Sequence, residues 1–285
     1  MNLQQVHLVD TTLRDGEQSP GLAFSLKIKK RLAFILDRAG IYQIEVGAPV
    51  MGDKEIEAVL AIKAVCQRAL VSTWNRLKLE DIEASFACRP DIIHLCLPVS
   101  EIHLQNKLNI SWETALSSLI TCLEAARRWG HEVSVGLEDV SRAESGRLLQ
   151  AATALRELGV RRIRLSDTVG ILTPGRLPTL LKKFVPNGFK VEFHAHNDLG
   201  LAEANSLRAA LNGAEYIDTT LLGVGERAGN CGLANFIRLA EATRNLTLGV
   251  QLQDALAMEI EAAPILNREY FMDQLLTSST AKFFY

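Results

Sequence analysis

Residues 190–198 read KVEFHAHND, and the pattern of this stretch favours a strand over a helix. Its apolar and polar side chains alternate with a period of two, as Val191, Phe193 and Ala195 against Glu192, His194 and His196. Alternation of this kind is typical of a β-strand, whereas an amphipathic helix would repeat every three to four residues. The polar side chains of this strand are therefore expected to share one face.

Seven similar short runs are spaced along the chain, and longer amphipathic segments lie between them. The eight predicted strands are 6–10, 41–47, 69–74, 91–97, 132–138, 161–166, 190–195 and 216–220. The predicted helical segments include 26–39, 55–67, 114–129, 143–158 and 202–211. Alternation of strands and helices predicts a parallel sheet. Eight such units favour an α/β fold of the closed (β/α)₈ TIM barrel type.

The chain of 285 residues suits one barrel, because α/β barrels commonly use about 200 to 250 residues as a single unit. We predict that residues 1–248 form the catalytic barrel and residues 249–285 a short helical C-terminal tail. The tail contains a predicted helix at 251–263, which Pro264 interrupts. Its apolar end, 283–285, is expected to dock against another chain.

Composition excludes several classes of partner. The formal net charge is −2 and the pI about 6.3, so no broad basic field is available for nucleic acid or an anionic membrane. The first residues resemble neither a secretion signal nor a transit peptide, and we expect a cytoplasmic enzyme. Five scattered cysteines without a CxxC pair are expected to be reduced. Small molecules or other subunits are the predicted partners.

Two histidines and two oxygen-bearing residues form a candidate metal site. His194 and His196 point to one side of their strand at a separation that one metal ion can bridge, although the pair alone fits a structural role equally well. Asp15 and Asn230 follow the first and last strands of the ring, which brings them near the seventh strand. These four ligands would suit Mg²⁺, Mn²⁺ or Zn²⁺ and leave positions open for substrate.

Four longer motifs carry a family resemblance. They are LVDTTLRDGEQ at 8–18, SDTVGILTP at 166–174, EFHAHNDLGLAEAN at 192–205 and LLGVGERAGN at 221–230. In order and spacing they resemble the acyl-CoA-condensing barrels, a family that includes 2-isopropylmalate, homocitrate and citramalate synthases. Further stretches, among them VSTWNR at 71–76, look most like homocitrate synthases associated with nitrogen fixation. The resemblance covers roughly residues 5–245.

The resemblance implies a condensation of acetyl-CoA with a 2-oxo acid, with 2-oxoglutarate as the preferred acid. Asp15, His194, His196 and Asn230 would hold the metal, which would bind the acid through its carboxylate and keto oxygen. Arg14 would stabilise the alkoxide that forms when the acetyl-CoA enolate attacks the keto carbon.

Four further residues receive roles from the same resemblance. Glu226 resembles the glutamate that helps to remove the acetyl methyl proton, a task that burial would assist by raising its pKa. Thr168 would donate to the carboxylate of the 2-oxo acid. Glu138 would orient the bound substrate groups. Gln18, on the same loop as Arg14 and Asp15, would contribute to substrate binding.

Other polar residues have simpler interpretations. Glu192 is expected to support the metal histidines from behind. His94 and His103 could face the substrate, but a hydrogen-bonded structural role is the better interpretation of each. The arginines of 161–164 are expected to form a solvated strand end.

Within the same family, a 2-isopropylmalate or citramalate synthase is the first alternative, and two other functions are also consistent with the sequence. A hydroxymethylglutaryl-CoA lyase would use a similar barrel, but in that enzyme a cysteine lies in the glycine loop before the asparagine ligand, whereas Cys231 follows Asn230 here. Alternatively, the chain is a poorly active barrel subunit. Family synthases continue into a helical region with a histidine, and no histidine follows His196. A homodimer or a separate C-terminal subunit would then complete the site.

The choice of 2-oxo acid depends on a cation for its second carboxylate. Homocitrate synthases of lysine biosynthesis resemble this chain but have an arginine on the fifth strand, where this sequence has Ser134. Another cation must replace it. Arg76, at the end of the third predicted strand, is the candidate from sequence.

Overall fold

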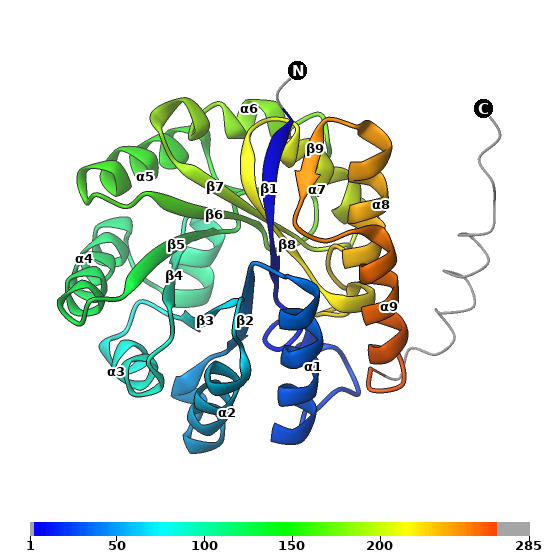
Figure 1. Cartoon of the computed structure of the whole chain (residues 1–285). Coiled ribbons are helices and arrows are strands. Elements are labelled where there is room, and N and C mark those ends of the chain that lie inside the picture. Colours follow the sequence, from blue (N-terminus) through cyan, green and yellow to red (C-terminus); the bar gives the residue numbers. More distant parts are fainter. Residues whose placement is uncertain (1–2, 267–285) are drawn as a thin grey trace.

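A computed structural model describes residues 3–266 as eight parallel strands closed into a barrel with helices around it (Figure 1). The strands are β1 (Gln4–Asp10), β2 (Gln43–Gly47), β3 (Leu70–Asn75), β4 (Ile92–Pro98), β5 (Glu132–Glu138), β6 (Arg162–Asp167), β7 (Lys190–Ala195) and β8 (Ala214–Thr219). The ring runs in chain order, and β1 pairs with both β8 and β2 to close it. The predicted (β/α)₈ barrel is confirmed.

The helices occupy the outer layer. They are α1 (Leu26–Ala39), α2 (Asp53–Val65), α3 (Leu79–Cys88), α4 (Trp112–Arg128), α5 (Ser145–Glu157), α6 (Leu177–Leu181), α7 (Ala202–Ala210), α8 (Leu233–Thr243) and α9 (Leu252–Ala262). Helices α3, α6 and α8 lie outside the segments predicted from periodicity. Helix α6 has only five residues and begins beside Pro178, so it is too short to reveal a period.

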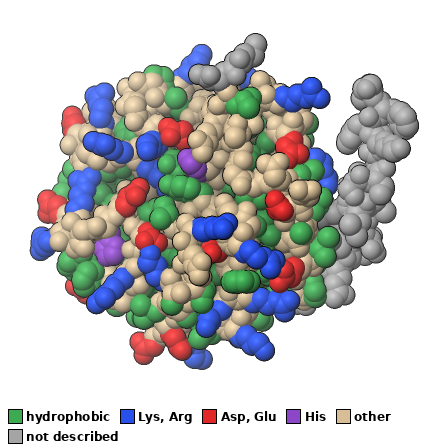
Figure 2. Space-filling model, in the orientation of Figure 1, with side chains coloured by type: hydrophobic (Ala, Val, Ile, Leu, Met, Phe, Trp, Pro, Cys, Tyr) green, Lys and Arg blue, Asp and Glu red, His purple; other side chains and the backbone are tan. Residues whose placement is uncertain are grey.

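The apolar core lies between the strands and the helices. Ile35 and Leu36 of α1 and Ile62 of α2 are fully buried there. Because each helix covers the seam between neighbouring strands, this layer excludes water from the outer face of the barrel. Within residues 3–266, no helix combines the length and apolar character needed to cross a membrane. Charged side chains of both signs are interspersed over the face in Figure 2, in keeping with the small net charge.

The inside of the barrel is charged, although barrel interiors are usually filled by branched apolar residues. Arg162 and Arg164 are 3% and 2% exposed, so the predicted solvated strand end is wrong for these two residues. Their side chains point inward and form ion pairs with Glu192 of β7. Residues two apart on a strand share a face, so both arginine side chains point into the barrel.

The described part of the tail packs on the barrel. A short strand, β9 (Leu246–Leu248), pairs in parallel with the start of β1. Helix α9 then lies beside α1 and α8 (Figure 1). Its buried Glu259 accepts hydrogen bonds from the backbone N–H groups of Leu222 (3.0 Å) and Ala234 (3.1 Å). Helix α9 therefore supports the loop that follows β8. The apolar segment 283–285 lies outside the described residues.

Asp37 connects α1 to the loop before β3. Its carboxylate accepts backbone hydrogen bonds from Gln67, Arg68 and Ala69 at 2.8–3.1 Å. The side chain is buried, and these bonds hold the pKa of Asp37 below its usual value despite the opposing effect of burial. This one carboxylate therefore ties the end of α1 to the turn into β3.

We expect Asp37→Ala to lower the free energy of unfolding by about 1–3 kcal/mol, because it leaves backbone N–H groups without an acceptor. Urea denaturation followed by circular dichroism measures the change. The exposed Glu57→Ala on α2 is the control, with an expected change within about 0.5 kcal/mol. Equal stability of the two variants would show that water replaces the carboxylate at no cost.

Candidate metal centre and active site

A cavity of about 470 Å³ opens at the C-terminal ends of the strands. This is the face where barrels of this type carry their active sites. Most of the residues selected from sequence line it, namely Arg14, Asp15, Gln18, Glu138, Thr168, His194, His196 and Glu226. Asn230 and Arg76 are not among the lining residues.

Asp15, His194 and His196 converge at one point of this cavity. The Nε2 atom of His194 lies 3.0 Å from Asp15 Oδ2 and 3.3 Å from Nε2 of His196. All three residues are buried, and their ligand atoms lie within 4.8 Å of one another. Among residues 3–266 this is the one group of three or more histidine, cysteine and acidic side chains arranged to hold a metal ion. Two nitrogens and a carboxylate oxygen fit a divalent cation.

Asn230 lies beside the group. A backbone bridge pairs Asn230 with His196, and the Asn230 amide nitrogen donates to the carbonyl of Val224 at 3.1 Å. Its Oδ1 is buried and accepts no hydrogen bond in the described part of the chain, so it is available as a ligand. Gly225 allows this position, because a Cβ there would lie 2.1 Å from the Asn230 side-chain nitrogen.

Asp218 of β8 orients His194 from behind. Its Oδ2 lies 3.0 Å from Nδ1 of His194, which leaves Nε2 to face Asp15. Such carboxylate contacts fix the ring and the tautomer of a metal-binding histidine. The prediction assigned this role to Glu192, which instead bonds the two inward-facing arginines of β6. Asp218 was missed in the sequence, although an acidic residue near the C-terminal end of a barrel strand was a usable signal.

The charges of this group are strongly coupled. Burial alone would lower the pKa of His194, but hydrogen bonds with Asp15 and Asp218 raise it to about 9. Burial and the neighbouring charge of His194 lower the pKa of His196 to about 3. Burial would raise the pKa of Asp15, yet Arg14 and His194 hold it well below its usual range. The carboxylate is therefore ionised, as a ligand must be.

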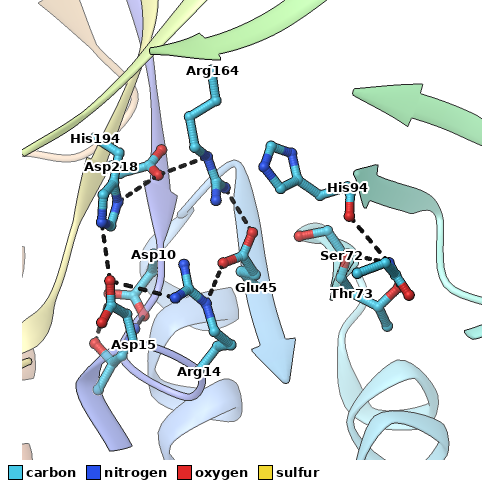
Figure 3. A network of polar contacts seen from close by, with 12 residues as sticks. Asp10, Arg14, Asp15, Glu45, Ser72, Thr73, His94, Arg164, His194 and Asp218 are labelled. Atoms are coloured by element: carbon cyan, nitrogen blue, oxygen red, sulfur yellow. Dashed lines mark hydrogen bonds and ion pairs between the residues drawn. The ribbon is translucent and has the colours of Figure 1, made fainter. Parts of the chain in front are cut away.

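Arg14 joins this group to a wider ring of charges (Figure 3). Its Nε donates to Glu45 Oε1 at 2.6 Å, and its Nη1 lies 3.5 Å from Asp15 Oδ2. The other oxygen of Glu45 accepts from Arg164 at 2.7 Å, and Arg164 Nε lies 3.0 Å from Asp218 Oδ2. Asp218 contacts His194, and His194 contacts Asp15, so these contacts form a closed ring. Arg14 is thus held rigidly beside the metal group while still lining the cavity.

Glu138 and Thr168 line the cavity from β5 and from the loop after β6. Burial raises the pKa of Glu138 above its usual value. The hydroxyl oxygen of Thr168 accepts a hydrogen bond from the backbone N–H of Asp139 at 2.9 Å, so its own hydrogen remains available to a ligand. Gln18 is exposed at the rim.

Glu226 lines the cavity but is not buried as expected. Its side chain is 45% exposed and its Oε2 accepts from Arg227 at 2.9 Å. Arg227 also binds Asp198 and the carbonyl of Thr168, so it connects the loops after β6, β7 and β8. The loop that carries Glu226 is therefore held in place by the contacts of Arg227.

Two further residues differ from their expected surroundings. Arg76 forms two hydrogen bonds to Asp81, at 2.9 and 2.8 Å, and its side chain is half exposed outside the cavity lining. His94 is buried with Nδ1 2.8 Å from the Ser134 hydroxyl, as a structural histidine would be, yet it also lines the cavity. Burial and the charge of Arg164 lower the pKa of His94 to about 3, so the His94 imidazole is uncharged at neutral pH.

The profile of a protein family described as HMGL-like matches residues 5–260. The chain belongs to the HMGL-like family. Homocitrate synthase subunit alpha of Clostridium pasteurianum is 39% identical over 265 residues, which are 92% of this chain and 98% of that protein. Homocitrate synthase 1 of Nostoc sp. is 38% identical over 87% of this chain and 66% of its own length. The predicted family is confirmed, and the chain is an enzyme of the acyltransferase type.

Another relative and a solved structure carry other names. The 2-isopropylmalate synthase 2 of Caldanaerobacter subterraneus is 37% identical, and the chain spans 64% of its length. Hydroxymethylglutaryl-CoA lyase of Pseudomonas aeruginosa superposes with a TM-score of 0.85 over 98% of this chain and all of that chain, at 23% identity. At that identity the likeness concerns the fold alone.

Removal of one metal-binding side chain should weaken metal binding strongly. We expect His194→Ala to lower the affinity for Mn²⁺ by more than the roughly 10- to 100-fold typical of a lost supporting partner. Electron paramagnetic resonance of free Mn²⁺ during a titration measures the constant.

His131→Ala is the matched control for this experiment. The side chain of His131 binds the carbonyl of Pro90 at the opposite end of the barrel, so affinity should be unchanged. Wild-type affinity in a folded His194→Ala protein would refute the ligand set.

Proposed function

We propose that the chain catalyses a Claisen-type condensation of acetyl-CoA with a 2-oxo acid, and that 2-oxoglutarate is the acid, giving homocitrate and CoA. The convergence of Asp15, His194 and His196 beside Arg14 in one cavity carries this proposal. The names of the relatives support it, since homocitrate synthases are among them. The overall reaction consumes one water and releases the CoA thiol.

The 2-oxo acid would bind with its reacting end at the metal group. A divalent ion held by Asp15, His194, His196 and Asn230 would supply Lewis acidity toward the keto group. The Thr168 hydroxyl would donate to the adjacent carboxylate of the acid, since its oxygen already accepts from Asp139. Gln18 would contact the bound acid from the rim, and Glu138 would orient it from β5.

Carbon–carbon bond formation requires a base and a stabiliser of negative charge. The carboxylate of Glu226 would take a proton from the acetyl methyl group, and the resulting carbon nucleophile would attack the keto carbon. The keto oxygen then becomes an alkoxide, whose charge Arg14 would stabilise from its fixed position. Protonation of that oxygen and hydrolysis of the thioester would complete the reaction. Glu138, whose pKa is raised by burial, is the second candidate for the base.

Removal of the acetyl methyl proton would be helped by a histidine that this chain lacks after His196. The Clostridium relative, nearly all of which this chain spans, is named as an alpha subunit. The Nostoc relative has a further third of its length beyond the match. We infer that this chain works with a separate polypeptide that supplies the helical region and its histidine.

The proposed reaction can be tested directly. Purified chain with Mg²⁺, Mn²⁺ or Zn²⁺ and acetyl-CoA should release CoA thiol fastest with 2-oxoglutarate, compared with 2-oxoisovalerate and pyruvate. Arg14→Gln should lower kcat by about 10²- to 10³-fold, because it removes a donor to the developing alkoxide. Arg208→Gln on the exposed face of α7 is the control and should retain activity. A preference of several-fold for 2-oxoisovalerate would instead favour an isopropylmalate synthase.

The assembly proposal has its own test. The chain alone should bind 2-oxoglutarate but condense acetyl-CoA poorly, since loss of one acid–base group costs about 10²- to 10⁴-fold in rate. Adding the unmatched region of the Nostoc homocitrate synthase as a separate polypeptide should raise the rate. Turnover of about 1 s⁻¹ or more by the chain alone would show that it needs no partner.

A further inference from the structure

Three lysine and arginine side chains line the cavity, and two of them are already neutralised by carboxylates. Arg14 is paired with Glu45 and Asp15, and Arg164 with three carboxylates. Lys107 lines the same cavity but forms no ion pair within residues 3–266. It is therefore the cavity cation whose charge remains available to a ligand.

Lys107 lies on a distinctive element. The segment η3 (Ile102–Leu108) is a π-helix, a rare conformation that is frequent at functional sites. It is anchored by buried His103 and Leu104, and the backbone N–H of Ile110 closes it on the Leu104 carbonyl at 2.9 Å. Asn109 ends it with a positive φ of 52°. The anchoring keeps the exposed Lys107 at the cavity while its backbone remains fixed.

The position of Lys107 in the ring places it across the cavity from the metal group. The element η3 follows β4, and in a ring of eight strands β4 and β5 lie opposite β8 and β1. Asp15 follows β1. Lys107 and Glu138, at the end of β5, line the same cavity, and the charge of Lys107 opposes the rise that burial causes in the pKa of Glu138. The cavity thus has a candidate cation site on one wall and a free ammonium group on the other.

We propose that Lys107 binds the distal carboxylate of a 2-oxo dicarboxylic acid whose 2-oxo end lies at the metal group. This inference rests on the proposed function and specifies its substrate class. An acid with a carboxylate at each end can engage both walls, whereas a monocarboxylic acid would leave the ammonium group unused. Arg76, the candidate from sequence, is paired with Asp81 outside the cavity lining and does not take this part.

The test compares two acids that differ only in the distal group. 2-Oxoglutarate and 2-oxovalerate share the 2-oxo end and the five-carbon chain, and calorimetry with the metal-loaded full chain gives Kd for each. Lys107→Met keeps most of the unbranched side chain and removes its charge. It should weaken 2-oxoglutarate binding about 10- to 100-fold, as expected for a lost charge-assisted hydrogen bond, and leave 2-oxovalerate binding unchanged. Lys107→Arg should restore most of the affinity.

Control variants make the outcome specific. Lys190→Met, at the N-terminal end of β7, and Arg76→Ala should leave the ratio of the two affinities unchanged. Equal weakening of both acids by Lys107→Met would overturn the proposal, as would no weakening or a loss confined to acetyl-CoA binding. Tight binding of 2-oxovalerate alone by the wild type would also overturn it while sparing the condensation. Binding of neither acid would contradict the proposed function itself.

Discussion

A closed ring of alternating charges inside the barrel determines the rest of the site. Its members, in order, are Asp15, Arg14, Glu45, Arg164, Asp218 and His194 (Figure 3). Each charge is desolvated, so each is tolerable only with its partners in place, and loss of one partner from such a buried pair typically costs about 3–5 kcal/mol. The same contacts that stabilise the interior therefore also fix Arg14 and His194, a member of the candidate metal group. Stability and catalytic geometry are coupled here, because neither can change without the other.

Much of the architecture followed from sequence because it depends on local pattern. Eight short alternating runs and the amphipathic segments between them were sufficient for the barrel and for placing Arg14, Asp15 and the two histidines on one face. The chain order of the ring then brings β1 next to β8 and close to β7, which made the convergence of Asp15 with His194 and His196 predictable. Four motifs gave the family, which the profile match and relatives confirmed.

The contacts that were missed join residues far apart in the chain. Glu45 and Arg164 are 119 positions apart, and no local pattern indicates that they meet. Arg162 and Arg164 were expected to be solvated because arginine is usually exposed. Their burial is tolerated because the carboxylates of Glu45, Glu192 and Asp218 face them. Likewise, pairing of Arg76 with Asp81 depends on the turn into α3, and the exposure of Glu226 depends on how Arg227 joins three loops.

The π-helix after β4 also bears on how such an enzyme could diversify. Among the described residues, η3 and the walls of β4 and β5 share no ion pair with the charged ring. A π-helix differs from an α-helix by about one residue per turn, so a single insertion or deletion there would rotate its exposed side chains and present a different one to the cavity. Such a change would leave the ring and its chemistry intact. The barrel mouth therefore has two parts: the charged ring fixes one of them, while side chains of the other can be exchanged without breaking an ion pair of the ring.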